Sequence, residues 1–322
     1  MRAIEVQHTG GPEVLRFTDR PDPVPGPGEL LVRVAATGVN PIDWKLRAGA
    51  MGPLHVTLPW VPGCELVGTV VATGAGATRF AAGERIVAML DPFKGGATAE
   101  LAVVHEDAAA RAPANFSDAE AAGLLVGGVT ALQAFHKANL RAGTRVLVHG
   151  AAGGVGHLAI QLARALGAKV TAVCASANVG WVSRLGPDRV IDRTVTDFTQ
   201  GDERYDVVLD AVGTSTYKAA RRVIVAGGTY VTTTVGPRSF VSAALAPLSR
   251  RHATWVTTSP VREDIETVAR FAADGALRVV LDQVYPWDEI AEAHEHSAAG
   301  RARGKIVVSI GEDRAGYGAS GA

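Results

Sequence analysis

A glycine-rich turn, Ala151-x-Gly153-x-x-Gly156, is the stretch whose residue types and spacing suggest chemistry most directly. An apolar run from Arg145 to His149 precedes it, and apolar residues at i, i+3 and i+4 follow it, as in a helix packed on one face. Another apolar run, Lys169 to Cys174, completes a strand–turn–helix–strand unit of about 30 residues. Small residues at such a turn let the backbone approach a pyrophosphate, and the unpaired N–H groups that begin the helix attract its charge. The pattern therefore predicts a dinucleotide-binding site.

The backbone of this turn would make most of the phosphate contacts. The residues predicted to do so are Ala152, Gly153, Gly154, Val155 and Gly156. Ligands of an open parallel sheet lie beyond the carboxyl ends of its strands. Two later pairs, Val212-Gly213 and Val235-Gly236, follow further apolar runs. They are predicted to lie at that edge, beside the nicotinamide half of the cofactor.

The second strand of the unit bears on the choice between NAD(H) and NADP(H). An NAD(H) site is expected to have an acidic residue about 20 residues beyond the turn, where it holds the ribose hydroxyls. No Asp or Glu occurs between Gly156 and Asp188. Ser176 and Asn178 offer hydrogen-bond donors to a 2′-phosphate instead, and Arg193 or Arg184 offers charge. The pattern favours NADP(H), the alternative being that these are ordinary polar loop residues.

Composition and charge limit the classes of protein to which the chain can belong. Its 322 residues are 47% hydrophobic, and 32 basic residues balance 32 acidic ones. Proteins that bind nucleic acid or anionic membranes usually carry a basic excess, so neither partner is predicted. No apolar run approaches the ~20 residues of a membrane span, and the charged N-terminus lacks the apolar segment of a signal peptide. We expect a soluble, cytoplasmic protein.

The order of the predicted elements indicates two domains. Residues 1–116 contain short strands with glycine turns, typical of a small barrel. Residues 117–258 alternate strands with helices, typical of a doubly wound parallel sheet. Residues 259–312 return to the first domain, and residues 313–322, rich in Gly, Ala and Ser, are predicted to be disordered.

The join between the two domains carries a helix-start signal. Ser117 and Glu120 have the spacing of a capping box. The helix behind them is expected to run toward Gly127-Gly128, and a second helix is expected over Val129 to Phe135.

Seven segments, in a fixed order and spacing, carry a family resemblance. They are Gly38 to Lys45, Pro62 to Gly68, Gly83 to Val87, Val129 to Ala131, Ala151 to Gly156, Val190 to Asp192 and Gly304-Lys305. Together they resemble the medium-chain dehydrogenase/reductase superfamily, and within it the zinc-independent quinone oxidoreductase branch. The resemblance implies an α/β fold, with a GroES-like β-barrel catalytic domain built from both chain ends and an inserted Rossmann nucleotide-binding domain. It also implies a homodimer formed through the edge of the nucleotide-domain sheet.

The resembling segments indicate whether this chain has the ligands of a catalytic zinc ion. Zinc-dependent relatives place a Cys three residues before the aspartate equivalent to Asp43, and a His before the glutamate equivalent to Glu65. This chain has Asn40 and Cys64 at those places. A single possible thiolate is no three-ligand catalytic site, so no metal is predicted. Without a strong Lewis acid, the chemistry left is hydride delivery from NADPH to an electron-poor acceptor, a quinone or an α,β-unsaturated carbonyl.

Three residues are predicted to be catalytic. Asn40 resembles the family's residue near the nicotinamide ribose, the alternative being a cap of the turn at Pro41. Thr130 resembles the family's threonine beside the nicotinamide ring, the alternative being a hydroxyl at a helix start. Lys45 could polarise a carbonyl or protonate an enolate, the alternative being a solvated surface lysine. Asn40 and Thr130 are also predicted to contact the cofactor, as is Lys305.

Three functions fit these residues. The leading one is an NADPH-dependent reductase of a quinone or enone. A second is a biosynthetic enoyl or keto reductase with a larger substrate, for which the small residues Gly49 to Gly52 would leave room. A third is an NADPH-binding protein without catalytic activity, since a fold does not fix a function.

Overall fold

A computed structural model describes residues 1–311, without the side chains of residues 237 and 238. The predicted disordered tail, 313–322, lies outside the described residues. The chain divides into two compact units. Unit 1 comprises residues 1–126, 260–273 and the part from 281 onward, and unit 2 comprises 127–259 and 274–280. The first division thus follows Val126, ten residues beyond the predicted join.

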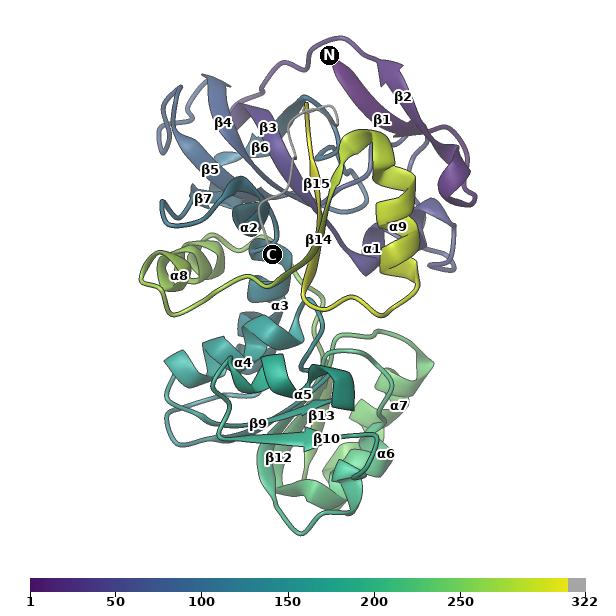
Figure 1. Cartoon of the computed structure of the whole chain (residues 1–322), viewed down its shortest axis with the longest axis vertical. Helices are drawn as coiled ribbons and strands as arrows, with labels where there is room; N and C mark the ends of the chain where they lie inside the picture. Colours follow the sequence, from purple (N-terminus) through teal and green to yellow (C-terminus); the bar gives the residue numbers. More distant parts are fainter. Residues whose placement is uncertain (312–322) are drawn as a thin grey trace. The chain divides into compact units, whose positions relative to one another are not determined.

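Unit 2 is built on a six-stranded, wholly parallel sheet (Figure 1). Across the sheet, the strands are β10 (Arg189–Asp192), β9 (Lys169–Cys174), β8 (Arg145–His149), β11 (Tyr205–Asp210), β12 (Ile224–Thr232) and β13 (His252–Trp255). The chain runs outward from β8 to β10 and then returns to the other side of β8. This is the doubly wound order, whose crevice lies where the direction changes, between β8 and β11. The predicted Rossmann fold is confirmed.

One helix of unit 2 precedes the first strand of this sheet, and the others lie between successive strands along the chain. They are α3 (Leu125–Lys137, whose first two residues belong to unit 1), α4 (Gly156–Ala165), α5 (Ser176–Ser183), α6 (Tyr217–Ala220) and α7 (Pro237–Leu245). The expected break at Gly127-Gly128 is wrong, because α3 passes through both residues. Gly127 has a packing reason instead: a Cβ atom there would lie 2.5 Å from the carbonyl oxygen of Gly154, in the glycine-rich turn. The missing side chain lets α3 approach that turn.

Unit 1 is a largely antiparallel sheet that joins both ends of the chain, as in a GroES-like domain (Figure 1). In order across the sheet, its strands are β14 (Leu281–Pro286), β15 (Lys305–Ser309), β3 (Glu29–Val39), β4 (Glu65–Thr73), β5 (Arg85–Met89) and β7 (Ala109–Arg111). Strand β6 (Leu101–His105) also pairs with β3. Strands β1 (Arg2–Val6) and β2 (Leu15–Asp19) form a separate antiparallel pair. The late strand β15 pairs with the early strand β3, so that Ile306 lies opposite Val39. This pairing brings Lys305 to the end of β3.

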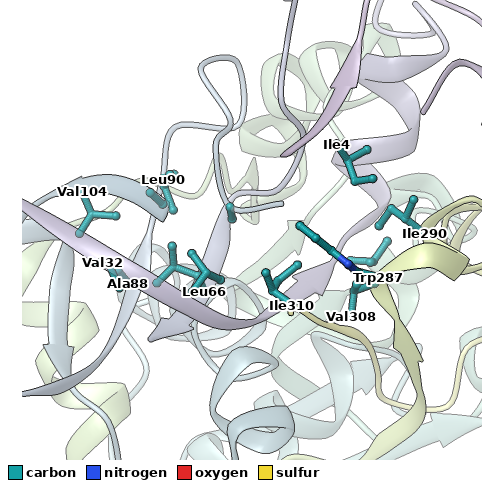
Figure 2. Packing of buried hydrophobic residues seen from close by; sticks show 14 of the residues in the cluster. Ile4, Val32, Leu66, Ala88, Leu90, Val104, Trp287, Ile290, Val308 and Ile310 are labelled. Atoms are coloured by element: carbon teal, nitrogen blue, oxygen red, sulfur yellow. The ribbon is translucent and has the colours of Figure 1, made fainter. Parts of the chain in front are cut away.

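The hydrophobic core of unit 1 is formed mainly by residues of these strands together with residues of the C-terminal helix α9 (Ile290–Ala298). Figure 2 shows Trp287, Ile290 and Val308, from the C-terminal part, beside Ile4, and the side chains of Val32 and Leu66 farther along the same cluster. The helices of unit 1 are α1 (Pro41–Arg47), α2 (Asp118–Ala122), α8 (Arg262–Ala273) and α9 (Ile290–Ala298). Short 3-10 segments in the two units are Pro12–Val14, Glu106–Ala108, Phe198–Gln200, Arg221–Val223, Ala246–Ser249 and Trp287–Glu289. No helix within residues 1–311 is long and apolar enough to cross a membrane.

Candidate active site

The glycine-rich turn follows β8 directly and leads into α4. Gly150 has φ +80°, a left-handed conformation that glycine adopts without strain. A Cβ atom at Gly156 would lie 2.1 Å from the carbonyl oxygen of Gly150, so only glycine fits there. Ala151, which replaces the usual first glycine, is buried, and its N–H donates to the Val173 carbonyl at 3.0 Å. The turn is therefore closed on itself and tied to β9.

The same turn offers free backbone donors. Gly153 donates its N–H to Gly150, and His157 donates to Gly153. In residues 1–311, no backbone hydrogen bond uses the N–H of Gly154 or Val155. Unpaired donors at the start of a ten-residue helix match the charge of a pyrophosphate. The turn fits a dinucleotide.

The residues predicted to hold a 2′-phosphate lie at the carboxyl ends of β9 and β10. Ser176 is the first residue of α5, and exposed Arg193 donates its N–H to the Cys174 carbonyl at 2.9 Å. Asn178 uses its side-chain oxygen to accept a bond from Trp181 at 3.1 Å. Asp192 adds a carboxylate that the sequence argument overlooked, and hydrogen bonds from Ser176 and Thr194 lower its pKa. The register that sets Asp192 opposite Cys174 could not be read from the sequence.

The pairs predicted for the nicotinamide half follow β11 and β12. Both Val212 and Val235 are about half exposed. The N–H groups of Val212 and Gly213 donate to Asp210, the buried last residue of β11, at 3.2 and 2.9 Å. Gly236 immediately precedes α7 and donates its N–H to the Ser239 hydroxyl at 3.0 Å.

In unit 1, a buried polar cluster gathers residues from distant parts of the chain. The Lys305 ammonium donates to Asn40 Oδ1 and to Glu65 Oε1, both at 2.7 Å. Asn40 Nδ2 donates to the same Glu65 oxygen at 2.9 Å, and Val126 N–H donates to Glu65 Oε2 at 2.8 Å. Asn40, Glu65 and Lys305 are 5%, 1% and 3% exposed, so water screens the two charges little and the Lys305 ammonium balances the Glu65 carboxylate. Glu65 was not among the predicted site residues, although it follows Cys64 in a resembling segment.

Burial raises the pKa values of two acidic groups beside this cluster. Asn40 donates its backbone N–H to Asp43 Oδ2 at 2.7 Å, whereas Oδ1 makes no hydrogen bond of ordinary geometry within the described residues. Burial raises the pKa of Asp43 to about 7, and the nearby charge of Glu65 adds to this. Burial also raises the pKa of the Cys64 thiol, whose sulfur is 3.8 Å from Asn40 Nδ2. In residues 1–311, no three His, Cys, Asp or Glu side chains are grouped so as to hold a metal ion.

The other two residues predicted to be catalytic make different contacts. Lys45 is on α1, and its ammonium lies over the ring of the adjacent Trp44, 5.6 Å from the centroid. Thr130 is on α3 in unit 2, and its hydroxyl contacts that of Thr258 at 2.5 Å. Of the residues predicted at the site, the structure thus brings Asn40 and Lys305 together.

Comparison with known proteins decides the family. Residues 26–114 match the family described as "Alcohol dehydrogenase GroES-like domain", and residues 185–308 match "Zinc-binding dehydrogenase". The chain is 33% identical to the chloroplast envelope quinone oxidoreductase homolog of Arabidopsis thaliana, over 96% of this chain and 98% of that protein. The chain belongs to the medium-chain dehydrogenase/reductase superfamily. Its relatives place it in the quinone oxidoreductase branch of that superfamily.

Other members of the superfamily are similar to this chain over most of its length. The 2-methylene-furan-3-one reductase of Solanum lycopersicum is 32% identical, over 87% of this chain and 71% of that protein. The structure of the quinone oxidoreductase from Coxiella burnetii superposes with a TM-score of 0.88 at 28% identity, covering 96% of this chain and 99% of that one. The protein is therefore an oxidoreductase of this superfamily, and its nucleotide-binding fold supports a nicotinamide cofactor.

Proposed function

We propose that this protein is an NADPH-dependent, zinc-independent reductase that transfers hydride to a quinone or an α,β-unsaturated carbonyl. The observation that carries the proposal is the buried Lys305–Glu65–Asn40 cluster. Glu65 already has an ammonium as its counterion, at 2.7 Å. Asn40 offers an amide where zinc-dependent relatives have a thiolate, and Cys64 is a protonated thiol. These donors do not form a three-ligand zinc site.

The donor set bears on the choice of substrate. Oxidation of a simple alcohol needs a strong electrophile to hold the alkoxide. An acceptor that is already electron-poor needs only orientation, exclusion of water and hydrogen bonds to the developing oxyanion. When bound, NADPH supplies the hydride. The names of two relatives, a chloroplast envelope quinone oxidoreductase homolog and a 2-methylene-furan-3-one reductase, agree with acceptors of this type.

The preference for NADPH rests on the groups at the ends of β9 and β10. The guanidinium of Arg193 is exposed, and the Ser176 hydroxyl, which contacts that of Thr194 at 2.5 Å, would turn to a 2′-phosphate. Asp192 opposes it in charge, but its carboxylate already accepts the N–H and the hydroxyl of Thr194, at 2.9 and 2.7 Å. Arg193→Ala is expected to weaken NADPH binding about tenfold and to leave NADH binding unchanged.

A homodimer is the assembly that we propose. β13 is an edge strand of the unit 2 sheet, with a hydrogen-bonded neighbour only in β12 among the described strands. The adjacent surface is apolar, since Phe240, Leu245 and Leu248 are 53%, 53% and 84% exposed. A second copy that paired at this edge would cover both features. Light scattering should give twice the chain mass, and Leu245→Glu should give the monomer.

Cofactor oxidation by the purified protein tests the function. NADPH and NADH are each offered with a naphthoquinone, a short enone and a simple ketone, with added zinc or with a chelator. We expect turnover with NADPH and the first two acceptors, unchanged by zinc or chelator. Turnover only with NADH or only with zinc would contradict the proposal. NADPH binding without turnover would instead favour a larger biosynthetic substrate or a non-catalytic protein.

A further inference from the structure

In unit 2, one buried carboxylate accepts an unusually large number of hydrogen bonds. It lies at the edge of the sheet where the parallel strands end. Asp210 is 0% exposed. Its Oδ1 accepts from the His149 ring at 3.1 Å, and from the N–H groups of Val212 and Gly213. Its Oδ2 accepts from the Tyr230 hydroxyl at 2.8 Å and from the N–H of Ser215 at 3.2 Å. Five donors, two from strands β8 and β12 and three from the loop after β11, thus converge on a single side chain.

The proton positions follow from the charge of this group. Burial raises the pKa of Asp210, but the bonds from His149, Tyr230 and Gly213 outweigh it, so that the pKa lies below its usual range. An ionised carboxylate has only acceptors, so His149 Nδ1 must carry the proton that it shares with Asp210. The network is satisfied only while Asp210 is charged.

The loop that Asp210 holds, Ala211–Ser215, packs against the glycine-rich turn. Ala211 donates its N–H to the His149 carbonyl at 3.0 Å. A Cβ atom at Gly150 would lie 1.9 Å from Val212 Cγ2, so the valine fills the space that the glycine leaves. Gly213 has φ +72°, and a Cβ there would lie 2.1 Å from Thr234 Oγ1, in the loop after β12. The loops after β8, β11 and β12 are therefore packed as one assembly.

We propose that Asp210 is a positioning residue for the dinucleotide: it fixes the Ala211–Ser215 loop against the glycine-rich turn and so preforms the backbone that meets the cofactor. The inference rests on the proposed binding of a nicotinamide cofactor by unit 2. Asp210 is covered by its donors and acts through the loop. A preformed loop spares the cofactor the entropy cost of ordering it. Loss of the anchor should therefore appear in cofactor affinity.

The same strand supplies a matched control at its other end. Asp206 accepts the backbone N–H and the Nε of Arg145 at 2.9 and 3.0 Å, and Arg145 Nη2 completes the pair at 3.0 Å. It lies four residues before Asp210, at the amino edge of the sheet, away from the glycine-rich turn that follows β8. Asp206→Asn and Asp210→Asn make the same chemical change on one strand.

Fluorescence titration with NADPH and with NADH, together with the melting temperature, tests the inference on the full-length protein. Both variants should melt below the wild type. Asp210→Asn should raise the Kd for the cofactor at least tenfold, and Asp206→Asn should change it less than twofold. Equal Kd values for Asp210→Asn and wild type, or equal losses in the two variants, would overturn the inference. A wild type that binds neither cofactor would instead refute the proposed function.

A second variant keeps the test decisive if Asp210→Asn does not fold. Tyr230→Phe removes one donor from Asp210 and no atom of the loop. We then expect a two- to fivefold rise in the Kd for NADPH. An unchanged Kd in Tyr230→Phe would overturn the inference in that case.

Discussion

Asp43 in unit 1 and Asp210 in unit 2 are the same side chain at nearly the same burial, 1% and 0% exposed, yet their pKa values shift in opposite directions. Asp43 has one well-formed hydrogen bond, an oxygen without one in the described residues, and the charge of Glu65 nearby. Asp210 has five donors. Burial alone therefore does not decide whether a carboxyl group is charged; the donors that the fold supplies decide it.

In unit 1, the buried carboxylate of Glu65 is stabilised differently from that of Asp210. There the balance comes from a formal cation, Lys305, whereas Asp210 accepts hydrogen bonds from three backbone N–H groups, a histidine ring and a tyrosine hydroxyl. A pair of opposite formal charges is sensitive to loss of either member, because the other is left buried and uncompensated. The following predictions sharpen this contrast.

Lys305→Met is expected to have the largest effect, a loss of about 3–5 kcal/mol in the free energy of unfolding. The variant leaves the Glu65 carboxylate without its ammonium. Chemical denaturation measures the loss. In the double variant with Glu65→Gln, the pair is neutral, and most of the stability should return. A loss below about 1 kcal/mol in the single variant would show that the pair is not a buried ion pair in solution.

Asp43→Asn should change the pH dependence of stability. The folded pKa of Asp43, about 7, is above the unfolded value of 3.8, so the folded state binds more protons in this window and stability falls as pH rises through it. The variant lacks this dependence. From pH 4.5 to 7 its stability relative to wild type should rise by about 3 kcal/mol. Asp210→Asn should show no such rise, because the folded pKa of Asp210 is lowered.

His294, buried on α9, should act in the opposite sense to Asp43. Burial lowers its pKa from 6.5 to about 3, and the charge of Arg47 contributes. The unfolded state then binds more protons, so stability falls as pH drops below 6.5. Between pH 6.5 and 5, His294→Leu should reduce this loss by about 2 kcal/mol, as followed by urea denaturation. Parallel curves for the variant and wild type would mean that His294 has the same pKa in the folded and the unfolded state, contrary to this prediction.

Tyr230→Phe is expected to have the smallest effect, a loss of about 1 kcal/mol, since it removes one of five hydrogen bonds to Asp210. The low pKa of Asp210 should rise only slightly. Thermal unfolding measures the first effect, and acid unfolding below pH 4 measures the second. A loss as large as that of Lys305→Met would mean that Asp210 depends on a single partner, as Glu65 depends on Lys305.

The sequence alone determined the features that depend on local spacing. The turn from Ala151 to Gly156 could be identified because its strand, glycines and helix are contiguous, and Gly156 is indeed a position where only glycine fits. The helix at Pro41 and the alternation of strands and helices after residue 145 are local in the same sense. These patterns sufficed for the fold class and the family.

Only the tertiary structure decided which side chains meet. Lys305 lies 240 positions after Glu65 and reaches it because β15 pairs with β3. Asp210 was visible as the end of an apolar run, but its partners His149 and Tyr230 come from separate strands. Gly127 looked like a helix break, and it lies inside a helix because the glycine-rich turn passes close to it. The charge of a buried side chain depends on the groups that surround it, and these come from distant parts of the sequence. The same is true of the close approach of one backbone segment to another. The local spacing of residues therefore does not predict either.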